Sequence, residues 1–477
     1  MLTYDVKLAG DTPLYYYLYR RIQADILSGR LKDGEQLPSK RALAEHLRVA
    51  VITVATAYDM LVTEGYALAR ERSGYYVHVP RHTTALQEQH LPSPYMPIPE
   101  ETPEALYPID FKANRISLSL FPRTTWNRLL RQTICEDADS LFTTIPFNGL
   151  YALRCAIAGY LERNRGMHIY PAQIIIGAGT EYLYGRLTQM FGRGSVFGFE
   201  EPGYRRLSQI ASGYGNECRF IPVDGEGLIT DVLIRSDINV LHVSPANHFP
   251  SGIAMSAPRR EALLDWVVQS PEHYIIEDDY DSEFRYKGRY ISPVFTQDRS
   301  GKVIYMNTFS KTMVPSLRIS YMVLPAGLLE RYKQTMSFYS CTVSSFEQHA
   351  LADFISHGYF ERHINRLKTY YGRIRKSMLQ ALKSSRLSAI SEVIEHNCGT
   401  HFLLVVRTCL TKEAAHEAGR EAGIRLMLYS DYGYHSPQPG RRILVINYAG
   451  ILPEQTIDVI RRLEQVFPEC RDIAPTG

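Results

Sequence analysis

The sequence predicts a small helical domain that ends in a two-stranded hairpin, then a linker, then a much larger α/β domain with a mostly parallel sheet. A chain of 477 residues is too long for one ordinary hydrophobic core. Five prolines fall between residues 92 and 103, in a segment without helical or strand periodicity. We therefore expect three parts: a domain over 1–80, a linker over 81–107 and a domain over 108–477.

The composition excludes several classes of protein. Hydrophobic residues make up 45% and charged residues 22%, which is typical of globular proteins. No apolar run approaches the roughly 20 residues that cross a bilayer, and the first residues do not form a secretory signal. The 7 cysteines are scattered without a C-x-x-C pair, which favours a reducing cytoplasm over a disulfide framework or a zinc site. The net charge of +3 does not by itself indicate nucleic acid.

The first 80 residues show helix signals in order. Apolar residues recur at helical spacing over 14–26, and the pattern stops at a serine-glycine pair. Ser39 is a suitable N-cap for a short helix over 40–47. A second helix is expected from about Thr53, and Gly65 ends it. These signals predict three helices.

A hairpin follows the helices. Two short strands are expected over 66–69 and 75–79, around a turn over 70–74 that carries two arginines. Three helices and a ribbon with a basic tip form a winged helix-turn-helix, which places one helix in the major groove of DNA. A helical dimerisation or lid domain would account for the helices but not for the basic tip. The predicted DNA contacts are Ser39, Lys40, Arg41, Arg48, Thr53, Arg70 and Arg72.

Residues 13–79 resemble the GntR class of bacterial regulators. The matching motifs are Leu37-Pro38-Ser39-Lys40-Arg41, Leu43-Ala44, Thr53-Val54 and Glu64-Gly65-Tyr66. The family usually has serine-arginine before the recognition helix, where this sequence has Ala50-Val51. Either Arg48 substitutes for the base-reading arginine, or readout depends on Arg41 and the hairpin. By this resemblance Lys40, Arg41, Arg70 and Arg72 are phosphate contacts.

The large block alternates short apolar runs with helical stretches, which predicts an α/β domain. Several of the runs lead directly into polar or glycine-rich turns, where ligands gather in such sheets. The expected strands are 173–176, 195–199, 239–243, 274–277, 302–306 and 319–324.

Two of these turns suit a flat, phosphorylated ligand. Residues 177–181 form a glycine-rich turn that opens a helix, and free N–H groups at such a turn can bind phosphate. Residues 201–204 follow a strand and could place the ring of Tyr204 on a planar group. Each signal alone is more often an ordinary turn.

A run of acids and a lysine give a sharper signal. Residues 277–279 are Glu-Asp-Asp at a strand end, which requires a cation or a metal such as magnesium or calcium. The next strand ends at Lys311, flanked by hydroxyl groups, where an amine is well placed to form an imine. An aspartate from the preceding strand can then pair with a protonated pyridine nitrogen, and Arg318 can reach the same phosphate as Ser310. We therefore predict pyridoxal phosphate on Lys311 as a Schiff base, and no metal.

Residues 110–465 resemble the fold-type I aminotransferases, with the family's motifs in order. In addition to the turns above, the matches are Gly149, Leu153-Arg154, Tyr160-Leu161, Arg165-Gly166 and Pro250-Ser251-Gly252. A GntR-type domain joined to such a domain is similar to the MocR family of bacterial regulators.

The resemblance implies roles for single residues. Lys311 would carry the cofactor, Asp278 would pair with the pyridine nitrogen, Tyr280 would contact the phenolic oxygen and Tyr204 would cover the ring. The phosphate would be held by Gly179, Thr180, Ser310 and Arg318. Asn247 or His248 would contact the ring oxygen, where the family more often has histidine-glutamine. A head-to-tail homodimer, bound to palindromic or direct-repeat DNA, is also implied.

Two functions stay open. One is a transcriptional regulator that binds promoter DNA and senses pyridoxal phosphate, an amino compound, or both. The other is an active aminotransferase with an attached winged helix. Aminotransferases usually clamp the substrate carboxylate with an arginine in the last strand, where this sequence has Val445. Possible replacements are Arg206, Arg425, Arg441 and Arg442, of which the last two are more typical of a solvated turn. The missing clamp favours the regulator and leaves half-reactions open.

Overall fold

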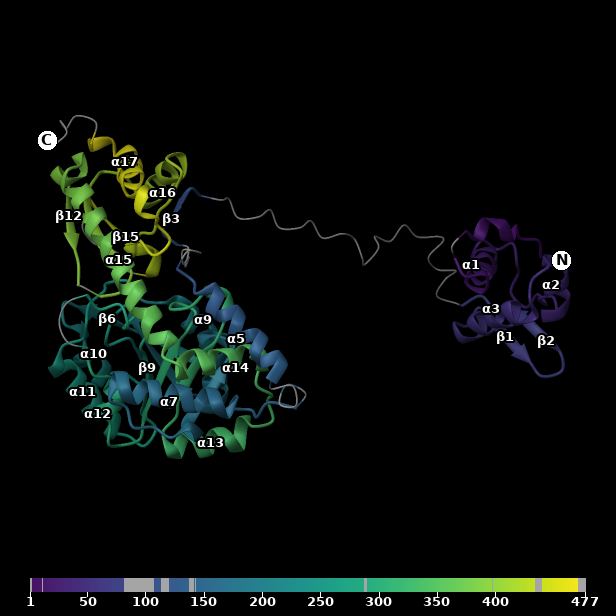
Figure 1. Ribbon diagram of the computed structural model, residues 1–477, viewed down its shortest axis with the longest axis horizontal. Helices are drawn as coiled ribbons and strands as arrows, with labels where there is room; N and C mark the ends of the chain where they lie inside the picture. The colour runs from purple at the N-terminus through teal and green to yellow at the C-terminus, as the bar shows by residue number, and fades with distance from the viewer. Residues whose placement is uncertain are drawn as a thin grey trace. The chain divides into compact units, whose positions relative to one another are not determined.

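The computed structural model shows two compact units, Met1–Glu104 and Ala105–Gly477 (Figure 1). It describes residues 2–10, 12–80, 107–112, 120–136, 141, 143–286, 290–396, 398–433 and 440–470. Apart from residue 107, the predicted linker lies outside these ranges.

The N-terminal unit contains the expected helices and hairpin. The elements are α1 (Leu14–Leu27), α2 (Lys40–Leu47), α3 (Val51–Thr63), β1 (Ala67–Arg70) and β2 (Gly74–Val77), after a 3₁₀ turn over Val6–Ala9. Helices α1 and α2 both pack on α3. Their apolar stripes meet in a core that includes Ile22, Leu43 and Tyr58.

The boundaries in this unit follow local chemistry. The Ser39 hydroxyl accepts a hydrogen bond from the Ala42 N–H at 3.2 Å, so the predicted N-cap of α2 is confirmed. Helix α3 begins at Val51, two residues before the expected start, because Ala50 is already extended and serves as its N-cap. Strands β1 and β2 pair antiparallel, with Arg70 opposite Gly74, and Arg72 in the turn has a φ of 57°.

An eight-stranded sheet organises the large unit. Its strands, in spatial order, are β4 (Ile174–Gly177), β11 (Ser320–Val323), β10 (Val303–Thr308), β9 (Tyr274–Asp278), β8 (Val240–Val243), β5 (Val196–Glu201), β6 (Glu217–Asp224) and β7 (Gly227–Leu228). The central run from β10 to β6 is parallel, whereas β11 is antiparallel to both of its neighbours and β7 to β6. The prediction of a mostly parallel sheet is confirmed, and all six predicted strands are present.

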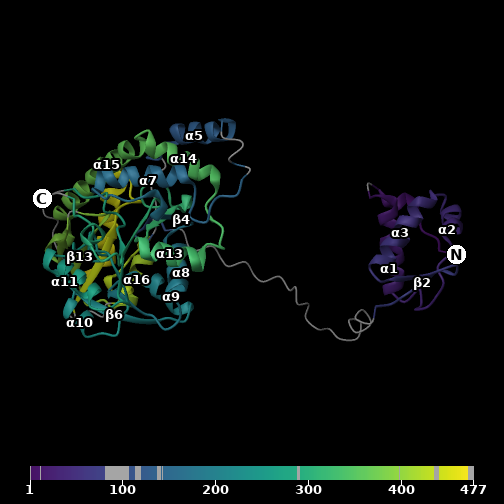
Figure 2. The ribbon, with the colours of Figure 1, turned by 90° about the horizontal axis from the view of Figure 1, so that it is seen from below.

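Helices cover both faces of this sheet, as Figure 2 shows. In β4, Ile174 and Ile176 belong to one core and Ile175 to the other, because successive side chains of a strand point to opposite faces. The first core includes residues of α7 (Tyr151–Arg165), α14 (Ser345–Ser356) and α15 (Tyr359–Lys383). The second includes α8 (Thr180–Phe191), α9 (Arg205–Gly213) and α13 (Ala326–Met336). The other helices that the structure describes before α15 are α5 (Arg123–Glu136), α10 (Thr230–Ile234), α11 (Ala257–Val268) and α12 (Val294–Gln297).

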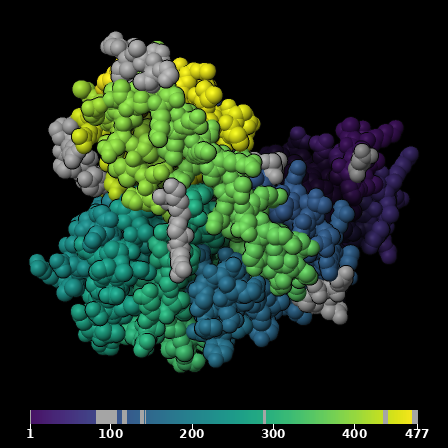
Figure 3. Space-filling model, turned by 60° about the vertical axis from the view of Figure 1, so that its left-hand side comes forward, coloured from purple at the N-terminus to yellow at the C-terminus, as the bar shows by residue number. Residues whose placement is uncertain are grey.

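The C-terminal segments form a second lobe of the large unit, green to yellow in Figure 3. Long helix α15 leads into an antiparallel sheet of β12 (Ser391–Ile394), β13 (His401–Arg407) and β15 (Arg441–Asn447). Helices α16 (Lys412–Glu421) and α17 (Thr456–Val466) pack against each other there, and β3 (Ile109–Asp110) pairs with β14 (Ile424–Arg425). Among the described residues, no helix is both long and apolar enough to cross a membrane.

Candidate functional site

The connection between β10 and β11 positions Lys311. Two backbone hydrogen bonds hold this connection. The Phe309 N–H donates to the Ile319 carbonyl at 2.9 Å, and the Met313 N–H donates to the Phe309 carbonyl at 2.8 Å. Phe309 and Met313 are buried, whereas Lys311 between them is half-buried. Buried apolar neighbours on both sides hold this segment in place, so that the lysine is presented at the end of the sheet.

The three consecutive acids at the end of β9 have three different environments. Glu277 accepts backbone N–H groups of Val294 and Phe295 at 2.9 and 2.8 Å. Asp279 accepts the hydroxyls of Tyr290 and Tyr305, at 2.9 and 2.7 Å, and lies 3.6 Å from a buried guanidinium, that of Arg165. Within the described residues, no group of three possible metal ligands is present. Backbone N–H groups therefore bind Glu277, whereas two tyrosines and an arginine lie against Asp279.

Asp278, between these two acids, faces a histidine that sequence reasoning missed. His242 on the neighbouring strand β8 places its Nε2 3.8 Å from Asp278 Oδ2. The His242 ring packs edge-on against Tyr184 with centroids 5.7 Å apart, and its Nε2 is buried without a hydrogen-bond partner. A histidine inside an apolar strand next to the acidic strand was the available signal.

Several buried polar atoms of the residues assigned to the cofactor have no hydrogen-bond partner within the protein. They are the Tyr280 hydroxyl, both polar atoms of the Asn247 amide and the Ser310 hydroxyl. Buried polar groups are nearly always hydrogen-bonded, so these atoms fit a site that holds a polar ligand. Each of these residues was assigned to the cofactor from the sequence, and their unmet hydrogen bonds fit a ring with a phenolic oxygen and a phosphate.

The glycine-rich turn at the start of α8 forms a close cradle with an arginine. Gly179 has a φ of 96°, and a Cβ added there would lie 2.6 Å from Nη2 of Arg318. Arg318 itself has a φ of 48° and ends the connection that carries Lys311. Thr180 Oγ1 and Ser320 Oγ are 3.5 Å apart. Only glycine allows the guanidinium to approach the turn this closely, which suits a shared anion at the helix N-terminus.

One carboxylate joins three of the predicted ligand contacts. Glu181 accepts a hydrogen bond from the Tyr204 hydroxyl at 3.3 Å, from Arg206 Nη1 at 3.1 Å and from Arg318 Nη2 at 3.4 Å. Burial raises the pKa of Glu181, but the hydrogen bond from Arg206 and the charges of Arg206 and Arg318 outweigh it and hold the pKa below its usual range. Nothing in the sequence pattern identified this residue.

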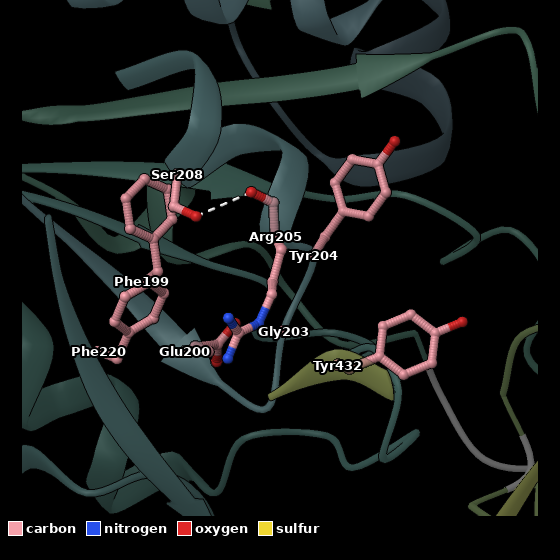
Figure 4. Close-up of a pocket in the computed structure, with 8 residues that line it drawn as sticks. All are labelled: Phe199, Glu200, Gly203, Tyr204, Arg205, Ser208, Phe220 and Tyr432. Atoms are coloured by element: carbon pink, nitrogen blue, oxygen red, sulfur yellow. Dashed lines mark hydrogen bonds between the residues drawn. The ribbon is translucent and has the colours of Figure 1, made fainter. Parts of the chain in front are cut away.

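Aromatic rings line the part of the site nearest Tyr204. Tyr204 and Tyr432 extend to the same side of a small hollow (Figure 4). Phe249 packs edge-on against Tyr432, with ring centroids 4.7 Å apart, and against His401, with ring centroids 5.6 Å apart.

Two buried histidines near these rings are neutral. His401 donates through Nε2 to the Pro250 carbonyl at 3.0 Å, and burial, with the Lys311 charge, lowers its pKa to about 4. Neighbouring His248 is held by Ser251 at 2.6 Å, and burial lowers its pKa to about 3.

The structure places the candidate effector arginines apart. Arg206 lies beside Glu181, whereas Arg425 is on β14, 3.7 Å from Asp110 of β3. Arg441 and Arg442 begin β15, opposite the end of β13. Val445 is buried and pairs with Leu403, so an aliphatic side chain occupies the position where a clamp was expected.

The arginines predicted to contact DNA are exposed: Arg41, Arg48, Arg70 and Arg72. Arg48 has a φ of 55° as the C-cap of α2. Lys40 differs from these arginines in having partners within the protein. Its Nζ lies 3.4 Å from Asp59 Oδ1 and over the ring of Tyr75. Thr53 is partly buried in α3.

Two apolar residues at the start of α3 were missed as candidates. Val51 is 47% exposed and Ile52 is 72% exposed. They directly follow Ala50, at the place where the sequence lacks serine-arginine.

Comparisons with known proteins agree with both halves of the structure. Residues 14–77 match the family described as bacterial regulatory proteins of the gntR family, and residues 110–441 match aminotransferase class I and II. A kynurenine aminotransferase of Pyrococcus horikoshii has a TM-score of 0.67 at 22% identity, covering 76% of this chain and 92% of that one. The fold and site therefore define a DNA-binding regulator fused to an aminotransferase-type domain whose cofactor is pyridoxal phosphate.

Two relatives match this chain over nearly their whole length. The HTH-type transcriptional regulator YdeL of Bacillus subtilis is 34% identical over 96% of this chain and 97% of its own length. The probable rhizopine catabolism regulatory protein MocR of Rhizobium meliloti is 33% identical over 96% and 94%. The chain belongs to the MocR family of transcriptional regulators.

Proposed function

We propose that this chain is a cytoplasmic, homodimeric regulator that binds promoter DNA through its N-terminal unit and senses pyridoxal phosphate, an amino compound, or both, through its large unit. The observation that carries the proposal is the set of buried, unpartnered polar atoms of Ser310, Tyr280 and Asn247, on a chain that also has a helix-turn-helix. The relative PdxR of Corynebacterium glutamicum is named a pyridoxine biosynthesis regulator, which makes the cofactor itself a candidate effector.

The chain's own residues divide the binding of the cofactor between them. When bound, pyridoxal phosphate supplies an aldehyde carbon that reacts reversibly with amines. The Lys311 amine is the covalent anchor, and Asp278, backed by His242 at 3.8 Å, would pair with the ring nitrogen. The unpartnered Tyr280 hydroxyl and Asn247 amide would hold the ring oxygen.

The phosphate would lie at the start of α8. The N–H groups of the turn after Gly179 point outward from the helix, whose dipole favours an anion. Thr180, Ser310 and the guanidinium of Arg318 complete the contacts, and the Ser310 hydroxyl is buried without another partner. Tyr204, 44% exposed, would cover the ring.

A sensing role is supported by the absence of a carboxylate clamp at Val445, which is buried and aliphatic. Arg206 is the candidate for an effector carboxylate at this site, because it lies beside the phosphate turn through Glu181. Arg425, held near Asp110, is the weaker candidate. A spectral titration of the loaded protein with amino acids and amines, followed by mass spectrometry, tests this role. Spectral change without product supports sensing, and multiple turnovers with a keto acid would make the chain an aminotransferase.

The N-terminal unit would contact DNA in two ways. Exposed Arg41, Arg70 and Arg72 would bind phosphates, and such contacts fix the position of the protein on the duplex. The exposed methyl groups of Val51 and Ile52, at the start of α3, would contact thymine methyl groups in the major groove. This surface therefore favours thymine where an arginine would select guanine.

A gel-shift experiment with DNA from the region upstream of its own gene tests the regulator. We expect sequence-preferring binding that weakens steeply with salt. Equal affinity for unrelated DNA, or no binding at low salt, would contradict the proposal. The proposed head-to-tail dimer is checked by light scattering after gel filtration, where a monomeric mass would rule it out.

A further inference from the structure

Glu181 is the second residue of α8, and its carboxylate contacts groups that the proposed function assigns to ligands. Oε1 accepts the hydroxyl of Tyr204 at 3.3 Å and Nη1 of Arg206 at 3.1 Å. Oε2 accepts Nη2 of Arg318 at 3.4 Å. The same Nη2 is the Arg318 atom closest to a Cβ built on Gly179. A carboxylate of the chain therefore engages the guanidinium edge that faces the phosphate turn.

The contact between Glu181 and Arg318 is of a kind that a stronger anion can displace. Their side chains are 34% and 51% exposed, so water screens the attraction and the pair is weak. A phosphate group carries roughly −1.5 to −2 charges and three acceptor oxygens, against one charge on a carboxylate. If phosphate takes Arg318, Glu181 retains Arg206 and Tyr204 as partners.

We propose that Glu181 competes with the cofactor phosphate for Arg318 and thereby keeps pyridoxal phosphate exchangeable. The proposal rests on the proposed function in one respect, namely that Arg318 contacts the phosphate. Each binding event must first break a contact within the chain, which lowers the apparent affinity for the phosphorylated cofactor. A lower affinity is useful to a sensor, because occupancy then follows the free concentration of the ligand.

The test uses the full-length apoprotein and two probes, pyridoxal phosphate and pyridoxal, which lacks the phosphate. Equilibrium absorbance titrations are made on the wild type, Glu181→Gln and Glu217→Gln. The last is a matched control, because Glu217 forms an exposed ion pair with Arg219 at 2.7 Å, on β6. We expect Glu181→Gln to bind pyridoxal phosphate about two- to fivefold more tightly, with no change for pyridoxal. The control should bind both probes as the wild type does.

Unchanged or weaker binding of pyridoxal phosphate by Glu181→Gln would overturn the proposal, since weaker binding would mean that Glu181 positions Arg318 for the phosphate. A gain shared equally by pyridoxal would also overturn it.

A double-mutant cycle with Arg318→Ala separates competition from a general charge effect. Arg318→Ala should weaken binding of pyridoxal phosphate and abolish the gain from Glu181→Gln. A gain that persists without Arg318 would overturn the competition. If Arg318→Ala left the affinity unchanged, the phosphate assignment itself would fail together with this inference. DNA binding, followed by gel shift, reports on the rest of the proposed function independently.

Discussion

The two candidate sites of this chain have opposite physical characters. The DNA-binding surface carries exposed arginines around a hairpin and a helix start, whereas the cofactor site contains buried polar atoms without partners. Phosphate backbones attract charges across water, so a DNA surface works while hydrated. A cofactor that needs a defined ring orientation is better held by groups already fixed and withdrawn from water. Loss of the covalent anchor in the large unit should therefore abolish cofactor attachment completely, whereas substitutions of the exposed arginines in the N-terminal unit should lower DNA affinity in a graded, salt-dependent manner.

The largest effect is expected from Lys311→Ala. Removal of the amine deletes the covalent anchor, so the absorption band of the lysine-bound cofactor should disappear completely. Absorbance of the dialysed protein after incubation with pyridoxal phosphate measures this. Circular dichroism should be unchanged, because the side chain is only half-buried. A persistent band with the wild-type spectrum would assign the anchor to another lysine.

Arg70→Ala and Arg72→Ala should reduce DNA affinity in a graded way. Arg70 ends β1 and Arg72 lies in the turn, and both are exposed, so each loss should lower the slope of log affinity against log salt by about 1. Titrations at several salt concentrations give this slope. Lys40→Ala is the comparison, since Lys40 already pairs with Asp59 and should change the slope less. If all three variants had the same slope as the wild type, the hairpin would not contact the DNA phosphates.

Acid should lower the free energy of unfolding of the large unit, because His401 is buried there as a neutral side chain. Burial lowers the folded pKa of His401 to about 4 from 6.5, so the unfolded chain binds the proton more readily. The stability contribution is complete above pH 6.5 and is lost as the pH falls from 6.5 towards about 4. Urea unfolding of the wild type and His401→Gln at pH 7 and pH 5 measures it. The wild type should lose more stability between the two pH values than the variant, and parallel losses would contradict the assignment.

The smallest effect is expected at the recognition helix. Val51→Ala or Ile52→Ala should cost about threefold in affinity, the scale of a few buried methyl groups. The corresponding DNA change is deoxyuridine for thymidine, which removes only the methyl group. Wild-type protein should bind the deoxyuridine DNA more weakly than the thymidine DNA. A variant that carries both Val51→Ala and Ile52→Ala should bind the two DNAs equally. A wild type indifferent to the methyl group would exclude this contact.

The sequence predicted the sheet and the position of Lys311 after a buried strand, because both depend on local patterns. Six apolar runs became strands, and the short connection after Val303–Thr308 places Lys311 by itself. Glu181, His242 and the separate fates of Glu277 and Asp279 were not predictable in this way. Their partners are distant in sequence: Arg318 lies 137 residues from Glu181. The start of α3 was misplaced by two residues because Ala50 carries no side-chain signal for a cap.

The reversed direction of β11 has a consequence for how such a chain can vary. Thr308 and Ser320 are register partners in β10 and β11, and their hydroxyls are 2.8 Å apart. Lys311 and Arg318 therefore lie near opposite ends of one closed loop whose base is clamped. The length of that loop sets the distance between Lys311, the proposed covalent anchor, and Arg318, the proposed anion contact. An insertion between them would leave both residues in the sequence but change their separation in space. Loop length, as much as residue identity, is what a survey of related chains should compare.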